Sequence, residues 1–181
     1  MAEPRPFRPV KLVCGILAAE EAHFEAAESR LSSAWGEIDI RSGRFPFVET
    51  DYYAAEIGPR LRRSFVSFAA LIAPEALSAV KLRTNAMEKE IGRAFGASRR
   101  AVNLDPGYLT EAALIMATAK NFSHRVPLQE GIYAHLEFLF SRTGIRRLEW
   151  TYPDFAKPKM VSYFLEVRRA YRRQLKSSQG G

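Results

Sequence analysis

The stretch Lys11-Leu12-Val13-Cys14-Gly15-Ile16-Leu17-Ala18 decides the fold that the sequence predicts. Every residue after Lys11 is apolar, which is typical of a strand that is buried on both faces of a sheet. Residues 20–35 follow, with apolar residues at helical spacing and with Gly36 where a helix C-cap belongs. A buried strand followed directly by a helix indicates a domain that combines both element types.

The next elements follow from the same kinds of pattern. The chain predicts, in order, a strand at 38–41, an irregular edge strand at 44–47, a loop at 48–60 and a strand at 61–72. The helix that begins after Pro74 and Glu75 is the clearest in the sequence. Its apolar face consists of Leu77, Val80, Thr84, Met87, Ile91 and Phe95.

A further strand is predicted at 101–104, where the turn residues Asp105-Pro106-Gly107 close it. The order is then β-α-β-β-α-β, the split arrangement of ferredoxin-like folds, in which helices cover one face of an antiparallel sheet. The predicted fold class is therefore α+β with a ferredoxin-like core.

The remainder of the chain is predicted to add a β-hairpin and a helix to this core. The hairpin joins residues 125–128 to the strand 131–140, whose Ile132, Ala134, Leu136, Phe138 and Phe140 alternate with polar residues. The helix covers about 158–175, and the aromatic segment 150–155 before it is interpreted as its packing anchor. Residues 110–120 fit a short helix and a strand equally well.

Length and composition predict one globular domain at 10–176, a flexible N-terminus at 1–9 and a disordered tail at 177–181. No apolar run has the length of a membrane span, and the N-terminus lacks the apolar stretch of a signal peptide, so we expect a cytoplasmic protein. The single cysteine, Cys14, excludes an intrachain disulfide and a cysteine-rich metal site. We interpret it as a buried structural thiol.

Several stretches of the chain resemble a bacterial family catalogued as domain of unknown function 4416. The resemblance covers nearly the whole chain and rests on Thr50-Asp51-Tyr52-Tyr53, Phe65-Val66-Ser67-Phe68 with Leu71-Ile72, Lys81 with Thr84-Asn85 and Glu88, Asn103-Leu104-Asp105-Pro106-Gly107-Tyr108-Leu109, Ala117-Thr118-Ala119-Lys120, His124-Arg125, Gly131-Ile132-Tyr133-Ala134 and Trp150-Thr151-Tyr152-Pro153-Asp154. It implies a cytosolic protein of unknown activity and supplies no catalytic residues. His135 stands where the family pattern predicts a glutamate, so the resemblance does not support a catalytic carboxylate there.

Some members of this family have been labelled GTP-binding proteins, and the sequence can be compared with that label. A P-loop needs a glycine-rich run that ends in Gly-Lys-Ser/Thr, and this chain has none. The Gly-x-Gly-x-x-Gly fingerprint and the Gly-x-Ser-x-Gly nucleophile elbow are also absent from the sequence. A nucleotide would have to bind in another way.

The best candidate site combines polar residues that follow strand ends with those of a later strand. Lys120 and Arg125 could hold an anionic substrate while His124 moves a proton and Asp105 orients its imidazole. The other candidate ligand-binding residues of this cluster are Asn103, Tyr133 and Glu137, with His135 between the last two. The alternative is that Asp105 caps a turn, His124 lies in a loop and the strand residues form a solvated sheet face.

Two further segments could contribute to a ligand site. The loop residues Asp51, Tyr52 and Tyr53 could cover a ligand together with nearby arginines, or could instead pack at the edge of the core. On the second long helix, Lys81, Asn85 and Glu88 share one stripe, which is equally typical of a pocket wall and of an exposed face. The three histidines lie on different elements, so no metal site is predicted, and the sequence indicates no cofactor.

Three classes of function remain open. The first is an enzyme or binder for a small anionic ligand that bears phosphate or carboxylate, since polar residues gather at strand ends and turns. The second is RNA binding by the last helix, because residues 157–176 hold seven basic residues and the single acid Glu166. An RNA-recognition signature is absent from the sequence, however. The third is a protein-interaction module, and the sequence predicts no oligomeric state.

Overall fold

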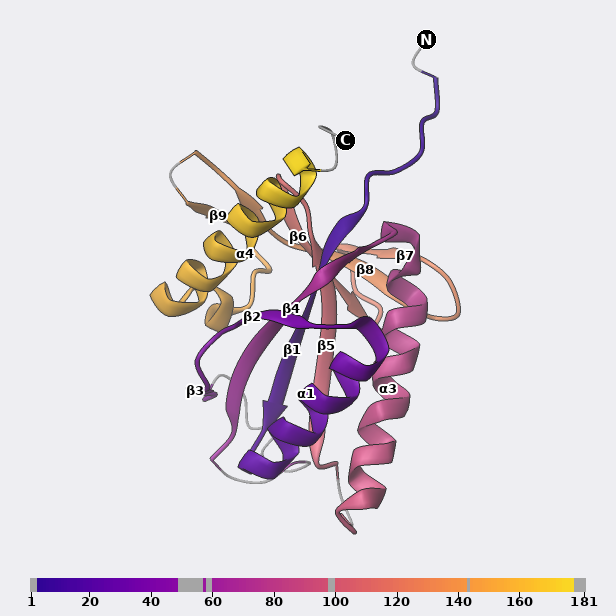
Figure 1. Ribbon diagram of the computed structural model, residues 1–181, viewed down its shortest axis with the longest axis vertical. Helices are drawn as coiled ribbons and strands as arrows, with labels where there is room; N and C mark the ends of the chain where they lie inside the picture. The colour runs from indigo at the N-terminus through magenta and orange to yellow at the C-terminus, as the bar shows by residue number, and fades with distance from the viewer. Residues whose placement is uncertain (1–2, 49–56, 58–59, 98–99, 143, 178–181) are drawn as a thin grey trace.

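The computed structural model describes residues 3–48, 57, 60–97, 100–142 and 144–177. Within these residues the chain forms a nine-stranded sheet in which every paired strand is antiparallel to its neighbour. Helices pack on both faces of the sheet (Figure 1). The predicted α+β class is therefore confirmed.

The strands are β1 (Val10–Ala18), β2 (Ile38–Arg41), β3 (Phe45–Pro46), β4 (Arg62–Ile72), β5 (Val102–Leu109), β6 (Ala113–Thr118), β7 (Arg125–Pro127), β8 (Tyr133–Phe140) and β9 (Ile145–Arg147). The helices are α1 (Glu21–Trp35), α3 (Leu77–Ala94) and α4 (Pro158–Ser177), with short 3₁₀ turns η1 (Pro74–Ala76) and η2 (Pro153–Ala156). The order across the sheet is β2-β4-β1-β5-β6-β8-β7, and β3 and β9 pair with β4 and β8.

The apolar stretch of β1 lies at the centre of the sheet and faces both helical layers. Leu12, Cys14 and Ile16 pack toward α1 and α3, while Val13 joins the cluster under α4. Each fully buried aliphatic side chain of this kind stabilises the fold by about 1.5–3 kcal/mol. The burial of β1 on both faces, which its sequence predicts, is therefore confirmed, and Cys14 is a buried free thiol.

The predicted helices are present, and their apolar stripes are largely buried. Four residues of α4, namely Met160, Phe164, Val167 and Tyr171, pack against the sheet as their spacing predicts. On α3 the stripe is buried up to Ile91. Phe95 is a correction, because it follows the last helical residue and is 45% exposed. Among the described residues, no helix has both the length and the apolar character that a membrane crossing requires.

Strand β5 corrects the turn that was predicted at Asp105-Pro106-Gly107, because all three residues lie inside the strand. They pair with β1, where Gly15 faces Asp105 and Cys14 faces Pro106. Proline is tolerated here because β5 pairs with β6 only from Gly107 onward. The local turn signal is thus overridden by pairing with a distant strand.

The segment 110–120, which fitted two structures, forms strand β6 after a turn at Thr110. Long-range pairing decides the matter, since β6 lies between β5 and β8. The hairpin of β7 and β8 is confirmed, but it belongs to a larger extension of the sheet that also contains β9.

The polar and apolar alternation predicted along 131–140 is interrupted in β8. The register with β6 shifts so that Ile115 faces Leu136 and Leu114 faces Phe138, which leaves Glu137 as the extra residue of a bulge. As a result, Phe138 packs under α4, whereas Ile132 packs in a separate cluster with residues of α3. The predicted single apolar face is therefore wrong, and the bulge aims Glu137 into the protein.

Candidate functional site

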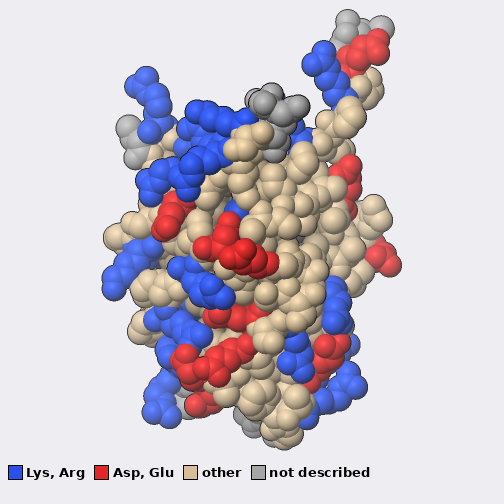
Figure 2. Space-filling view, in the orientation of Figure 1, with Lys and Arg blue, Asp and Glu red and all other residues tan. Residues whose placement is uncertain are grey.

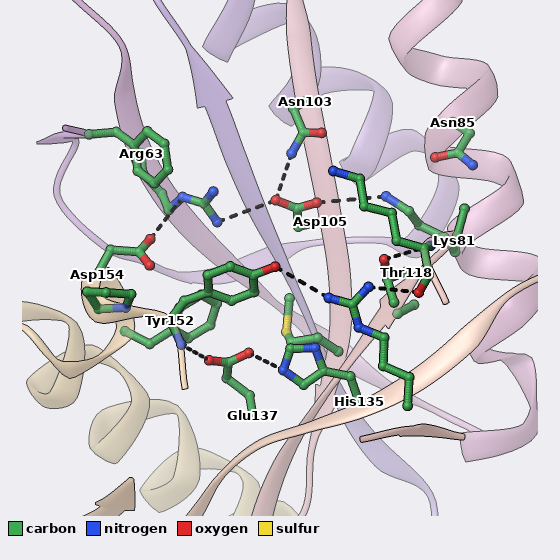
Figure 3. A pocket seen from close by; sticks show the side chains of 18 of the residues that line it. Arg63, Lys81, Asn85, Asn103, Asp105, Thr118, His135, Glu137, Tyr152 and Asp154 are labelled. Carbon is green, nitrogen blue, oxygen red and sulfur yellow. Dashed lines mark hydrogen bonds and ion pairs between the residues drawn. The ribbon is translucent and has the colours of Figure 1, made fainter. Parts of the chain in front are cut away.

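A cavity of about 460 Å³ lies where β6 leaves β5, and we call it the polar cavity. Strand β5 pairs with β6 only from Gly107 to Leu109. The residues of β5 before Gly107 therefore have no strand partner on that side. Side chains from β4, α3, β5, β6, β7, β8, η2 and the connecting segments converge there (Figure 3). Its charged and polar described residues are Arg63, Lys81, Asn85, Arg100, Asn103, Asp105, Thr118, Lys120, Arg125, His135, Glu137, Tyr152 and Asp154.

Asp105 is the centre of the first cluster in the polar cavity. Its carboxylate accepts a hydrogen bond from the Asn103 amide at 2.6 Å and lies 3.4 Å from an Arg63 nitrogen and 3.8 Å from the Lys81 ammonium. Burial alone would raise the pKa of Asp105, but the two cations and the amide together hold this pKa below its usual value. Asp105 is therefore ionised at neutral pH.

Lys81 reaches the cavity from α3, which lies in the same helical layer as α1. Its ammonium donates a hydrogen bond of 2.8 Å to the Leu104 carbonyl at the free edge of β5. The side chain is buried, so the interpretation of this stripe as a pocket wall holds for Lys81 and for Asn85, which also lines the cavity. The third stripe residue, Glu88, is buried as well and accepts a 2.6 Å hydrogen bond from the Leu104 amide.

Arg63 forms the opposite wall of the polar cavity. Its Nε lies 3.1 Å from Asp154 of η2, and its guanidinium also faces Asp105. The same group lies over the ring of Phe47 at 4.7 Å from the ring centroid. Two carboxylates and a phenyl ring thus fix Arg63 and neutralise its charge.

A histidine and a glutamate form a second cluster, on β8. The Nε2 atom of His135 lies 2.7 Å from one oxygen of Glu137, and the other oxygen accepts a 2.7 Å hydrogen bond from the Tyr152 amide. Both residues are buried, which corrects the alternative that placed them on a solvated sheet face. Figure 3 shows the second ring nitrogen of His135 on the side away from Glu137, toward the cavity. A carboxylate that fixes an imidazole in this way is the arrangement used for general acid-base chemistry.

Arg125 is a cation of the polar cavity that the described carboxylates leave unpaired. Its guanidinium donates to the Lys120 carbonyl at 2.7 Å and to the Tyr152 hydroxyl at 3.5 Å, and both acceptors are neutral. Among the described residues, no carboxylate lies within ion-pair distance of Arg125, and its Nε is buried without a hydrogen-bond partner. A buried donor on a cation at a cavity wall is the position where an anionic ligand atom would be stabilised.

His124 lies beside this cluster and does not line the polar cavity. Its ring stacks on Trp150 at 4.7 Å and meets the His135 ring edge-on at 5.1 Å. Burial lowers the pKa of His124, and the nearby His135 and Arg125 lower it further. The pairing of His124 with Asp105 that the sequence suggested differs from the observed one, since the carboxylate partner in this region is Glu137 and its histidine is His135.

The structure brings together seven of the candidate site residues of the sequence, which are Lys81, Asn85, Asn103, Asp105, Lys120, Arg125 and Glu137. Tyr133 lies at the start of β8, opposite Thr118 and Pro127, and is not one of the lining residues. The candidates Asp51, Tyr52 and Tyr53 lie outside the described residues.

Sequence reasoning missed the lining residues of the segment before α4. Tyr152 and Asp154 contact the site, although the aromatic density of this segment indicated only packing. A carboxylate inside an aromatic stretch was the available signal, because a charge rarely lies among packed rings without a partner. Within the described part of the chain, no group of three or more His, Cys, Asp or Glu side chains could hold a metal ion.

Comparison with known proteins gave one match. A family model described as "Domain of unknown function (DUF4416)" matches residues 8–171. Searches of curated proteins and of solved structures found no match. The matched region includes every described residue that lines the polar cavity.

Proposed function

The chain belongs to the DUF4416 family, a description that assigns no activity, and we propose from the polar cavity that it binds a small molecule bearing a phosphate or carboxylate group. The observation that carries this proposal is Arg125, a cation whose contacts are all to neutral atoms. Leaving a buried donor of a charged group unpaired is costly, so an anion at this position gains more than it would at a surface arginine.

The charge of the cavity supports the same ligand class. Its described lining holds five basic side chains against three carboxylates, which leaves an excess of two positive charges. The acids are engaged by other residues, because Asp105 and Asp154 contact Arg63 while Glu137 contacts His135. Arg125 is therefore part of this excess, because the described residues give it no carboxylate partner.

Size and polar groups support a ligand no larger than a metabolite. A volume of about 460 Å³ is within the range of small-molecule sites, which is roughly 300–1,000 Å³. Asn85 and Asn103 line the same space and can bind the neutral polar groups of a ligand.

The histidine pair supports a further step, in which the protein acts on its ligand by proton transfer. Glu137 holds the His135 ring through Nε2 while the other ring nitrogen faces the cavity (Figure 3). An imidazole fixed in this way can accept a proton from a ligand or donate one to it. His135 then takes the role that the sequence suggested for His124.

We also infer that the first half of the chain is the ferredoxin-like unit that the sequence predicts. Support comes from the strand order β2-β4-β1-β5, in which each pair is antiparallel, and from the packing of α1 and α3 against the same cluster of sheet residues. A cytoplasmic location stays a prediction, and the single buried Cys14 agrees with a reducing compartment.

Titration calorimetry with inorganic phosphate, pyrophosphate and citrate tests the proposal. We expect one of these anions to bind, and Arg125→Gln to weaken that binding about tenfold or more, because a charge-assisted hydrogen bond is lost. Arg146→Gln is the matched control, since it removes the same charge from the exposed face of β9 and should leave the affinity unchanged. Equal loss in both variants would reduce the effect to net charge and would refute the assigned site.

RNA binding by α4 is the competing function, and titration with short RNA beside the small anions addresses it. Figure 2 shows basic side chains gathered toward the end of α4, where Arg168, Arg169, Arg172, Arg173 and Lys176 lie. Two of them are engaged within the chain, because Arg168 donates to the Glu111 carbonyl at 2.8 Å and Arg172 lies 3.3 Å from the Glu111 carboxylate. Binding of short RNA that weakens in Arg173→Gln, with no binding of the small anions, would favour this alternative.

A further inference from the structure

A second cavity adjoins the polar cavity and differs from it in chemistry. It has a volume of about 500 Å³, and we call it the apolar cavity. The two cavities share Phe47, Arg63 and Asp154 as lining residues. Among the described residues, these three side chains are therefore the place where the two cavities adjoin.

The lining of the apolar cavity is chiefly hydrocarbon. Its walls are supplied by Phe45 and Pro46 of β3, by Phe47, which follows β3, and by Met160 of α4. The ring of Phe45 is only half-buried. A half-buried phenyl ring beside a cavity offers a surface that an apolar group can cover.

The charges at the boundary between the cavities do not prevent an apolar occupant. Arg63 and Asp154 pair at 3.1 Å, so the shared wall presents no unpaired charge. Arg63 also lies over one face of the Phe47 ring. The Lys159 ammonium lies 5.3 Å from the centre of the Phe45 ring. The Lys159 side chain is exposed, so its charge lies at the rim of the apolar cavity.

We propose that the ligand is amphipathic, with an anionic head group in the polar cavity and an alkyl chain in the apolar cavity. The substrate class is then alkyl phosphates or alkyl carboxylates, and the proposal rests on the proposed function because the head group binds beside Arg125. The alkyl chain then runs from the head group beside Arg125 and enters the apolar cavity at Arg63, Phe47 and Asp154.

The test is a homologous series of n-alkyl phosphates from ethyl to octyl, titrated below their micelle-forming concentrations, with inorganic phosphate as the first member. The dissociation constant should fall about fourfold for each methylene that enters the apolar cavity, until that cavity is filled. In Phe45→Gln this dependence on chain length should become shallower, while the affinity for inorganic phosphate should stay unchanged.

Phe95→Gln is the matched control, because Phe95 is another partly exposed phenylalanine, beyond the end of α3 and away from both cavities. It should keep the full dependence on chain length. Dissociation constants that do not change with chain length, or a dependence that is identical in both variants, would overturn the amphipathic ligand but leave anion binding intact. If inorganic phosphate and every alkyl phosphate fail to bind while the protein is folded, the proposed function itself fails.

Discussion

Two buried lysines, Lys11 in β1 and Lys81 in α3, differ in the groups that compensate their charge. Lys11 is completely enclosed, where it pairs with Asp39 of β2 and donates a 3.0 Å hydrogen bond to Gln174 of α4. Lys81 donates to a backbone carbonyl and has its carboxylate neighbour 3.8 Å away, at the wall of the polar cavity. The first lysine is satisfied by the fold, whereas the second is positioned next to space for a ligand.

The surroundings of the two lysines extend this difference. Asp39 also accepts a 2.6 Å hydrogen bond from Ser67, and Gln174 donates to the Ala69 carbonyl at 2.6 Å, so the Lys11 network joins β1, β2, β4 and α4. Asp105 beside Lys81 keeps two other partners, Asn103 and Arg63. A buried charge therefore indicates a binding site when the charged side chain itself lines a cavity, as Lys81 does, and when its own removal leaves the fold largely satisfied.

The largest effect is expected from Lys11→Met, which keeps the length of the side chain but removes its charge. Asp39 and Gln174 lose their shared partner, and we expect the free energy of unfolding to fall by about 3 kcal/mol, the lower end for a broken buried pair because Asp39 is partly exposed. Urea denaturation measures the change. Lys81→Met should cost only about 1 kcal/mol, because Asp105 retains its other partners. Equal losses in the two variants would contradict the distinction between them.

A smaller effect is expected from Gly107→Ala, at the point where β6 joins β5 and the polar cavity begins. A β-carbon on this residue would lie 2.5 Å from the Ile115 carbonyl oxygen, so the two strands must separate. We expect a loss of about 2 kcal/mol, typical of overpacking, with weaker anion binding because the gap that admits Lys81 changes shape. Calorimetric melting compares it with Gly96→Ala, where a β-carbon meets no atom within 4 Å and only the positive φ is strained. If Gly107→Ala melts at a temperature no lower than Gly96→Ala, β5 and β6 can separate without a large loss of stability, and this prediction is wrong.

The smallest effect concerns the pH dependence that His124 contributes. Its pKa lies below the usual value because of burial and of the neighbouring His135 and Arg125, so the unfolded chain binds this proton more tightly than the folded protein does. The contribution of His124 to stability is then complete above about pH 6.5 and is lost as the pH falls toward the lowered pKa. Urea unfolding from about pH 7.5 to 5.5 should show a shallower decline in His124→Gln than in the parent protein.

Anion binding should act on the same histidine. An anion beside Arg125 offsets the repulsion between the guanidinium and the imidazolium, so saturating phosphate should raise the pKa of His124 in an NMR titration. An unchanged pKa with phosphate bound would place the anion away from Arg125.

The sequence by itself determined the elements whose patterns are local and strong. The apolar run of β1, the stripe of α3 and that of α4 each specify which face is buried, so these elements and the α+β class could be predicted from spacing. Lys81, Asn103 and Arg125 could be selected as site candidates because polar residues at strand ends and beside apolar stripes stand out in such patterns.

Only the tertiary structure decided how these pieces are combined. Pairing with β1 extends β5 through a segment that its own residues mark as a turn, and the late start of the β5–β6 pairing opens the cavity into which Lys81 reaches. The bulge in β8 directs Glu137 to His135, and η2 brings Asp154 to Arg63 from far along the chain. These contacts depend on strand register and on residues distant in sequence, whose positions no local pattern of side chains specifies.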